Sequence, residues 1–177
     1  MSVTQTDFSG AHVLVTGGAG FIGSHLVDAY LARGSRVTVL DDLSTGTAGN
    51  LAAGAELVEG DIRDTRVLDR LFRERFDLVN HHAAQIDVRR SVSDPAFDAE
   101  VNVVGSLRLL ERAAAAGTGR FIFASSGGAI YGEPQAVPQT EDHPAAPISP
   151  YGCAKLSIEH YLHYYREVRG LHFTALR

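Results

Sequence analysis

The chain has 177 residues, of which 45% are hydrophobic and 21% are charged, a balance that is typical of a globular domain and excludes a disordered, collagenous or membrane-spanning chain. Sixteen Lys and Arg against twenty-one Asp and Glu give a net charge of −5 without a basic stripe, so we expect no nucleic-acid partner. One cysteine, no long apolar run and a polar start without a signal pattern predict a cytoplasmic protein with no membrane partner.

Short apolar or β-branched runs alternate with longer segments of helical period, which predicts βαβ units on a parallel sheet. Six strands are predicted, at His12–Thr16, Arg36–Leu40, Glu56–Glu59, Phe76–Asn80, Arg120–Ala124 and Leu171–Leu176. Four helices are predicted between them, at Phe21–Ala32, Thr65–Arg75, Pro95–Ala116 and Pro150–Arg169. Because crossovers between parallel strands are right-handed, we expect an α/β fold with a doubly wound sheet of strand order 3-2-1-4-5-6.

Two of these helices have marked starts. Asp94-Pro95 and Ser149-Pro150 each combine a side chain that can cap the free first-turn amides with a proline, whose missing N–H costs nothing at that position. The segment Gly127–Ile148 holds four of the six prolines and is too long for a simple connector. We therefore expect it to be a functional loop over a site.

A glycine-rich turn joins the first strand to the first helix. Its glycines, Gly17, Gly18, Gly20 and Gly23, fit both the GxGxxG and the GxxGxxG spacing. Such a turn brings backbone amides against a pyrophosphate at a helix N-terminus, and Gly23 lets the helix approach the strand. Glycine turns also arise as plain helix caps, but the order strand, turn, helix favours dinucleotide binding.

Carboxylates follow the second and third strands. Asp41 and Asp42 are placed to accept hydrogen bonds from the ribose hydroxyls of an adenosine and would repel a 2′-phosphate, which favours NAD over NADP. Asp61 is placed to meet the adenine amino group. The alternatives are that Asp41 and Asp42 cap a loop and that Asp61 is an ordinary turn aspartate.

A tyrosine and a lysine lie four residues apart at the start of the last helix, so Tyr151 and Lys155 share one face. A neighbouring ammonium and the positive end of a helix both stabilise a phenolate, so we expect the pKa of Tyr151 to be lowered toward the range of a general acid/base. A plain helix-surface pair is the alternative. Lys155 is the only lysine beside fifteen arginines, which favours chemistry that arginine cannot perform.

A serine follows the fifth strand at the edge where ligands of open parallel sheets bind. We expect Ser126 to present a hydroxyl to a substrate. A serine that merely ends a strand is the alternative.

Seven segments carry a family resemblance: TGGAGFIGSHL at 16–26, LDDLSTG at 40–46, GDIRD at 60–64, HHAAQ at 81–85, Asn102 with its neighbours, SSGGAIYG at 125–132 and SPYGCAK at 149–155. Together they resemble the extended short-chain dehydrogenase/reductase family, and within it the UDP-glucose 4-epimerases and related nucleotide-sugar epimerases. The resemblance runs from residue 11 to the end of the sequence. It implies an NAD-binding Rossmann domain over residues 1–177.

The resemblance also implies roles for single residues. Tyr151 would take the proton from the sugar C4 hydroxyl while hydride passes to a retained NAD, and the 4-keto sugar would turn over to receive the hydride on its other face. Lys155 would tune Tyr151 and bind ribose, and Ser126 would hydrogen-bond the C4 oxygen. The implied cofactor site comprises Gly17, Gly20, Phe21, Ile22, Gly23, Asp41, Asp42, Ser44, Thr45, Gly46, Asp61, Ile62, Ala83, Ala84, Gln85, Asn102, Tyr151 and Lys155.

The expected reaction can be narrowed further. Dehydratase and decarboxylase branches of the family carry an acidic residue just after the catalytic Ser or Thr, and residues 127–130 contain none. We therefore expect C4 epimerisation of a nucleotide-sugar, with a UDP-sugar as partner. The alternatives are an NAD-dependent reductase or dehydrogenase of a nucleotide-sugar or another carbonyl, and a non-catalytic NAD-binding domain.

Family members pair through two long helices, which implies a homodimer through residues 95–116 and 150–169. Val101, Leu109, Ile158 and Leu162 could form that face or belong to the core. The family's C-terminal substrate-binding lobe has no counterpart within the 177 residues. We expect a partial chain, or a naturally short protein, in which NAD binding is partly retained and epimerase turnover is absent or very low.

The remaining reactive side chains receive no catalytic role. His81-His82, His160 and His163 lack a third ligand in sequence, so we expect loop and helix-surface positions and no metal site. Cys153 has no task in the proton transfer and is expected to be a small packing residue.

Overall fold

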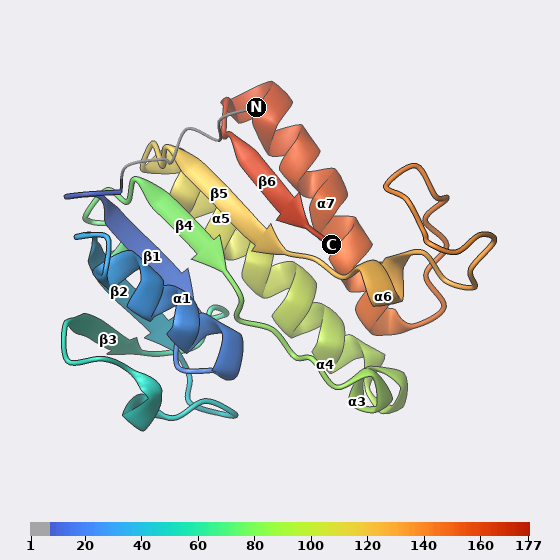
Figure 1. Cartoon of the computed structure of the whole chain (residues 1–177), viewed down its shortest axis with the longest axis horizontal. Helices are drawn as coiled ribbons and strands as arrows, with labels where there is room; N and C mark the ends of the chain where they lie inside the picture. The colour runs from blue at the N-terminus through green and yellow to red at the C-terminus, as the bar shows by residue number, and fades with distance from the viewer. Residues whose placement is uncertain (1–7) are drawn as a thin grey trace.

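The computed structural model describes residues 8–177 and contains one six-stranded sheet (Figure 1). All neighbouring strands are parallel and follow the order β3-β2-β1-β4-β5-β6, which confirms the predicted doubly wound Rossmann topology. The strands are β1 (His12–Thr16), β2 (Arg36–Asp41), β3 (Ala55–Glu59), β4 (Leu78–His81), β5 (Arg120–Ala124) and β6 (Phe173–Leu176).

The helices lie between and beyond these strands. The longer ones are α1 (Phe21–Leu31), α2 (Thr65–Leu71), α5 (Ser106–Ala115) and α7 (Pro150–Arg169). Shorter elements are the 3₁₀ turn η1 (Ala48–Asn50), α3 (Val88–Ser93), α4 (Pro95–Ala99), the π-helix η2 (Glu100–Gly105) and α6 (Gly127–Ile130).

Both proline-marked starts are confirmed. The carboxylate of Asp94 accepts a hydrogen bond from the amide of Phe97 (3.0 Å), and the hydroxyl of Ser149 accepts one from the amide of Gly152 (3.1 Å). Helix α7 has the predicted bounds and ends at Gly170, whose φ of 69° suits a residue without a side chain.

The helix predicted over residues 95–116 is confirmed as a continuous helical stretch over 95–115, but it is not uniform, because a π-helix, η2, separates α4 from α5. A π-helix widens one stretch by a residue without changing the hydrophobic spacing enough to be seen in sequence. Helix α3 was not predicted either, although Asp87 caps it by accepting from the amides of Arg89 and Arg90.

Other boundaries shift by a few residues. Strand β4 begins two residues later than predicted and includes His81, β6 begins at Phe173, and α2 ends at Leu71. The predicted long loop begins with α6 and returns to it, because the amide of Ala146 donates to the carbonyl of Ile130 (2.9 Å).

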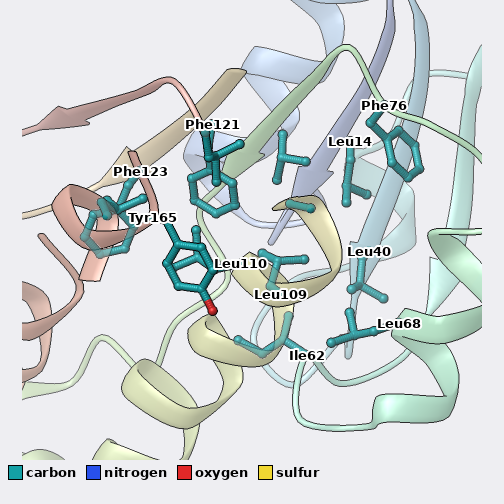
Figure 2. Packing of buried hydrophobic residues seen from close by; sticks show 14 of the residues in the cluster. Leu14, Leu40, Ile62, Leu68, Phe76, Leu109, Leu110, Phe121, Phe123 and Tyr165 are labelled. Carbon is teal, nitrogen blue, oxygen red and sulfur yellow. The ribbon is translucent and has the colours of Figure 1, made fainter. Parts of the chain in front are cut away.

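Two apolar clusters cover the two faces of the sheet. Helices α2, α5 and α7 line the larger cluster, and Figure 2 shows its side chains, among them Leu14, Phe121 and Tyr165, gathered between sheet and helices. Helix α1 lines the smaller cluster on the other face through Val27 and Tyr30. Leu109, Ile158 and Leu162 are completely buried in the larger cluster, so they belong to the core and not to a dimer face.

Within residues 8–177, no helix has both the length and the apolar character needed to cross a membrane.

Candidate functional site

The glycine-rich turn after β1 leaves no room for a side chain at Gly17, Gly18 or Gly23. Gly17 has a φ of 69°, and a Cβ on it would lie 2.6 Å from the amide nitrogen of Ala83. A Cβ on Gly23 would overlap the carbonyl oxygen of Gly17, and one on Gly18 would lie 2.8 Å from Val39. The turn therefore packs closely against the start of α1 and the carboxyl ends of β2 and β4.

The start of α1 can receive an anion. Gly20 is its N-cap and supplies no side chain, so the amides of Phe21, Ile22 and Gly23 have neither an intrahelical nor a side-chain partner among the described residues. Such amides, with the helix dipole, are suited to a pyrophosphate. The side chains of Phe21 and Ile22 are 80% and 61% exposed beside this position.

The two aspartates after β2 hold turns as well as facing this site. Asp41 is 7% exposed, and its carboxylate accepts from the amides of Ala19 and Leu43, both at 2.9 Å. Asp42 is exposed and accepts from the amide (3.0 Å) and the hydroxyl (2.6 Å) of Ser44. Because a carboxylate has about four acceptor positions, both retain capacity for ribose hydroxyls.

The segment Ser44–Gly46 lies against the glycine-rich turn. A Cβ on Gly46 would come within 2.8 Å of the backbone of Ala19, and the carbonyl of Ala19 accepts from the amide of Thr47 (3.2 Å) and the side chain of Asn50 (2.8 Å). The predicted cofactor residues after β2 are therefore brought next to those after β1.

The predicted cofactor residues after β3 already have partners within the protein. Asp61 binds Arg63 through its guanidinium (2.5 Å) and its amide (2.7 Å), and these hydrogen bonds lower the pKa of the Asp61 carboxyl. Asp61 thus has the turn role that the sequence allowed, while Ile62 is 4% exposed in the core.

The segment after β4 is hydrogen-bonded to η2. The side chain of Asn102 accepts a hydrogen bond from the backbone amide of Gln85 (2.9 Å) and donates one to its carbonyl (2.8 Å). Both backbone groups of Gln85 are therefore bonded. The amide of Ala83 donates to the hydroxyl of Thr16 (3.2 Å), which ties this segment to β1. Ala84 lies between these two anchored positions and is partly buried.

His81 does not occupy the predicted loop position, because it ends β4 and is 1% exposed. The hydroxyl of Ser106 donates to the carbonyl of Asn102 (2.7 Å), so it can only accept from Nε2 of His81 (2.8 Å). Nδ1 then accepts from the hydroxyl of Thr16 (2.6 Å). Burial and the charge of Lys155 hold the pKa of His81 well below its usual value, which agrees with this neutral tautomer.

Tyr151 and Lys155 lie at the carboxyl ends of the strands. Lys155 is 4% exposed, and its ammonium donates to the carbonyl of Ala124 (2.9 Å) at the end of β5. The same nitrogen lies 5.6 Å from the centre of the Tyr151 ring and 4.8 Å from that of Phe123. Lys155 is therefore not an exposed helix-surface lysine.

The predicted direction of the Tyr151 pKa is wrong for this state of the protein. Burial raises the pKa of Tyr151, and the negative charge of Asp98 raises it further. Burial lowers the pKa of Lys155 to about 8, and the charge of Asp98 opposes that shift. The sequence could not reveal Asp98, because it lies more than fifty residues away on α4.

Adjacent serines after β5 have different surroundings. Ser125 donates its hydroxyl to Glu159, which also binds the guanidinium of Arg177 at 2.5 Å. Arg177 in turn donates to the hydroxyl of Tyr131 (3.0 Å). Ser126 begins α6 without using its side chain as a cap, so its partly buried hydroxyl remains available.

The remaining reactive residues form no second centre. Cys153 is exposed, so its prediction as a packing residue is wrong. His160 and His163 are exposed on α7, as expected. No group of three potential metal ligands occurs within residues 8–177.

The chain matches the model of the NAD dependent epimerase/dehydratase family over residues 13–177. It belongs to this family. The match includes the glycine-rich turn, both aspartates after β2, and the Tyr151–Lys155 pair.

Individual relatives agree with the family assignment. A UDP-glucose 4-epimerase of Mycolicibacterium smegmatis is 49% identical over 163 residues, which cover 89% of this chain and 52% of that protein. The Thermus thermophilus UDP-glucose 4-epimerase, solved in complex with NAD, is 48% identical with a TM-score of 0.90 and is covered to 54%, against 94% of this chain. The Thermotoga maritima enzyme, solved with UDP-glucose, has the same identity and coverage and a TM-score of 0.92. The chain thus spans about half the length of these relatives.

Proposed function

We propose that this chain is the cofactor-binding and catalytic half of an NAD-dependent nucleotide-sugar 4-epimerase of the UDP-glucose/UDP-galactose type. The observation that carries the proposal is the buried ammonium of Lys155 beside Tyr151, on the sheet edge that also holds the glycine-rich turn. The names of the relatives support the same reaction class.

The cofactor site has two parts. The uncapped amides at the start of α1 would hold the pyrophosphate, and Asp41 with Asp42 would accept from the adenosine ribose, which favours NAD over NADP. The segments 44–46, 61–62 and 83–85 with Asn102 would line the remaining length. NAD in the Thermus thermophilus relative supports this choice of cofactor.

The proposed proton transfer occurs at the phenolic oxygen of Tyr151. Bound NAD would supply a reversible hydride acceptor for C4 of the sugar. Because burial raises its pKa, Tyr151 is protonated in this state and is ready to donate to a 4-keto oxygen. In the oxidising direction, the Lys155 ammonium would stabilise the phenolate, and the uncommitted hydroxyl of Ser126 would hydrogen-bond the C4 oxygen.

We also propose a homodimer through residues 95–116 and 150–169 in the cytoplasm. Exposed Tyr161, Tyr164 and Val168 recur on one side of α7 and support a protein contact there. The exposed thiol of Cys153 suits a reducing compartment. Sedimentation velocity tests the dimer, and a monomer at all concentrations would contradict it.

The function is tested by incubating concentrated protein with NAD and UDP-galactose and separating the sugar nucleotides. We expect very slow conversion to UDP-glucose without net NADH, abolished in Tyr151→Phe and unchanged in Cys153→Ser, which alters an exposed side chain on the same helix. Accumulation of NADH equal to the sugar oxidised would instead indicate a dehydrogenase. NAD binding with equal behaviour of Tyr151→Phe and the unaltered chain would indicate a non-catalytic domain.

A further inference from the structure

Asp98 is a buried carboxylate that the proposed proton transfer does not use. It is 1% exposed, and its Oδ1 accepts from the side-chain amides of Gln85 and Asn102, each at 3.0 Å. Its Oδ2 is also buried and has no hydrogen-bond partner within residues 8–177. A buried acceptor without a partner costs free energy, so its retention here requires a reason.

The charge that compensates Asp98 lies on the neighbouring helix. Helix α4 packs against α7, and Lys155 is buried there. Burial raises the pKa of Asp98, and the hydrogen bonds from Gln85 and Asn102, followed by the charge of Lys155, oppose that shift. In return, the charge of Asp98 favours the protonated form of Lys155. The two groups therefore stabilise each other's ionised forms across the α4–α7 contact.

The titratable groups that lie near Lys155 are neutral near pH 7, whereas the guanidinium groups of Arg63 and Arg90 lie over the ring of Phe97, next to Asp98. Burial holds the pKa of His81 far below its usual value and lowers that of His82 to about 4, and Tyr151 keeps its proton. In the described chain, Asp98 is the acid whose charge reaches both Tyr151 and Lys155. The buried ammonium of Lys155, which would repel a cationic nicotinamide, is thus accompanied by a negative carboxylate at the reacting end of the site.

Building on the proposed function, we propose that Asp98 is a positioning residue whose fixed negative charge favours the oxidised, cationic nicotinamide over the reduced, neutral one. Its hydrogen bonds to Gln85 and Asn102 hold this charge in place behind the segment after β4. Only the oxidised ring gains Coulomb energy from such a charge, so the carboxylate shifts the balance between the two cofactor forms. An epimerase must return the hydride it removes, and this balance is therefore part of its chemistry.

The test compares NAD with NADH on the 177-residue chain. Asp98→Asn removes the charge, while its amide oxygen can still accept from Gln85 and Asn102. In calorimetric titrations at pH 6.5, where Lys155 is protonated, we expect the ratio of NAD affinity to NADH affinity to fall about tenfold. For a two-electron couple this fall raises the potential of the bound cofactor by about 30 mV.

Two further variants keep the test decisive. Asp94→Asn removes the same charge from the exposed start of the same helix, where asparagine also caps, and should leave the ratio unchanged. Asp98→Ser is measured as well, in case Asp98→Asn shows no cooperative thermal unfolding. An unchanged ratio of NAD affinity to NADH affinity in a folded Asp98 variant overturns this inference but leaves the proposed function standing. Absence of NAD binding to the unaltered chain overturns the proposed function first.

Discussion

The two ends of the candidate site are built by different means. At the glycine-rich turn, Gly17, Gly18 and Gly23 allow backbone segments to touch, and the groups offered to a ligand are main-chain amides. Where α7 begins and packs against α4, the groups are buried polar side chains, with Lys155 on α7 and Asp98 on α4 as opposite charges. The first end is therefore sensitive to added volume, and the second to changes of charge and pH.

The largest effect should come from volume at the first end. In Gly23→Ala the new Cβ would overlap the carbonyl oxygen of Gly17, and neither backbone segment can move without opening the turn. We expect the free energy of unfolding to fall by about 4 kcal/mol or more, with NAD binding lost. Urea unfolding measures the change in stability, and calorimetry measures NAD binding. Gly49→Ala is the control, because its Cβ would meet only Thr47 at 3.8 Å.

A charged side chain should be the next most costly to alter. Glu159 accepts from Ser125 and Arg177, and these bonds hold the pKa of its carboxyl low although burial acts to raise it. We expect Glu159→Gln to reduce the free energy of unfolding by about 2 kcal/mol. Glu167→Gln, which alters an exposed pair with Arg166, should change it by less than about 0.5 kcal/mol. Equal effects of the two substitutions would contradict the importance of the Glu159 network.

Acid should weaken the second end before the first. His82 has its pKa lowered to about 4 by burial and by the charge of Lys155, against 6.5 when unfolded. The unfolded chain therefore binds more protons between these values, so stability is complete above about pH 6.5 and falls as the pH drops toward 4. We expect His82 to account for a loss of about 1–2 kcal/mol by pH 5. Unfolding of the unaltered chain and of His82→Gln at pH 7.5 and 5.0 measures it, and the variant should lose this part of the dependence while keeping the part due to His81, whose pKa is also lowered by burial. A flat profile in the unaltered chain would be inconsistent with a buried neutral imidazole.

The smallest effect is expected at the exposed thiol. Cys153→Ser should change the free energy of unfolding by less than about 0.5 kcal/mol, because the side chain fills no core position. N-ethylmaleimide should modify Cys153 in the folded protein, as mass spectrometry can follow. Protection of the thiol until the protein unfolds would mean that it is packed after all.

Local signals predicted much of the fold. The Asp94-Pro95 and Ser149-Pro150 starts, the bounds of α7 and the strand order depend on capping chemistry, helical spacing and crossover handedness, all of which can be read from sequence. The glycine-rich turn was also evident, because its steric requirement admits one residue type. Features of this kind do not depend on distant neighbours.

What could not be predicted depends on neighbours far along the chain. The single-residue widening at η2 left the hydrophobic spacing of residues 95–116 looking like one helix. The pKa of Tyr151 was assigned the wrong direction because burial and Asp98 are properties of the assembled fold. His81 looked like a loop residue, since nothing local shows that Thr16 and Ser106 will meet its two nitrogens.

The hydrogen bonds of His81 run in one direction, from backbone amides through Thr16, the imidazole and Ser106 to the carbonyl of Asn102. A ring proton fixed in this way and shielded from solvent exchanges slowly. It should give a separate NMR resonance, whereas exposed imidazole protons are lost to exchange. That single resonance would report, without any added label, whether the hydrogen bonds that link Thr16, His81 and Ser106 beneath the cofactor site remain formed.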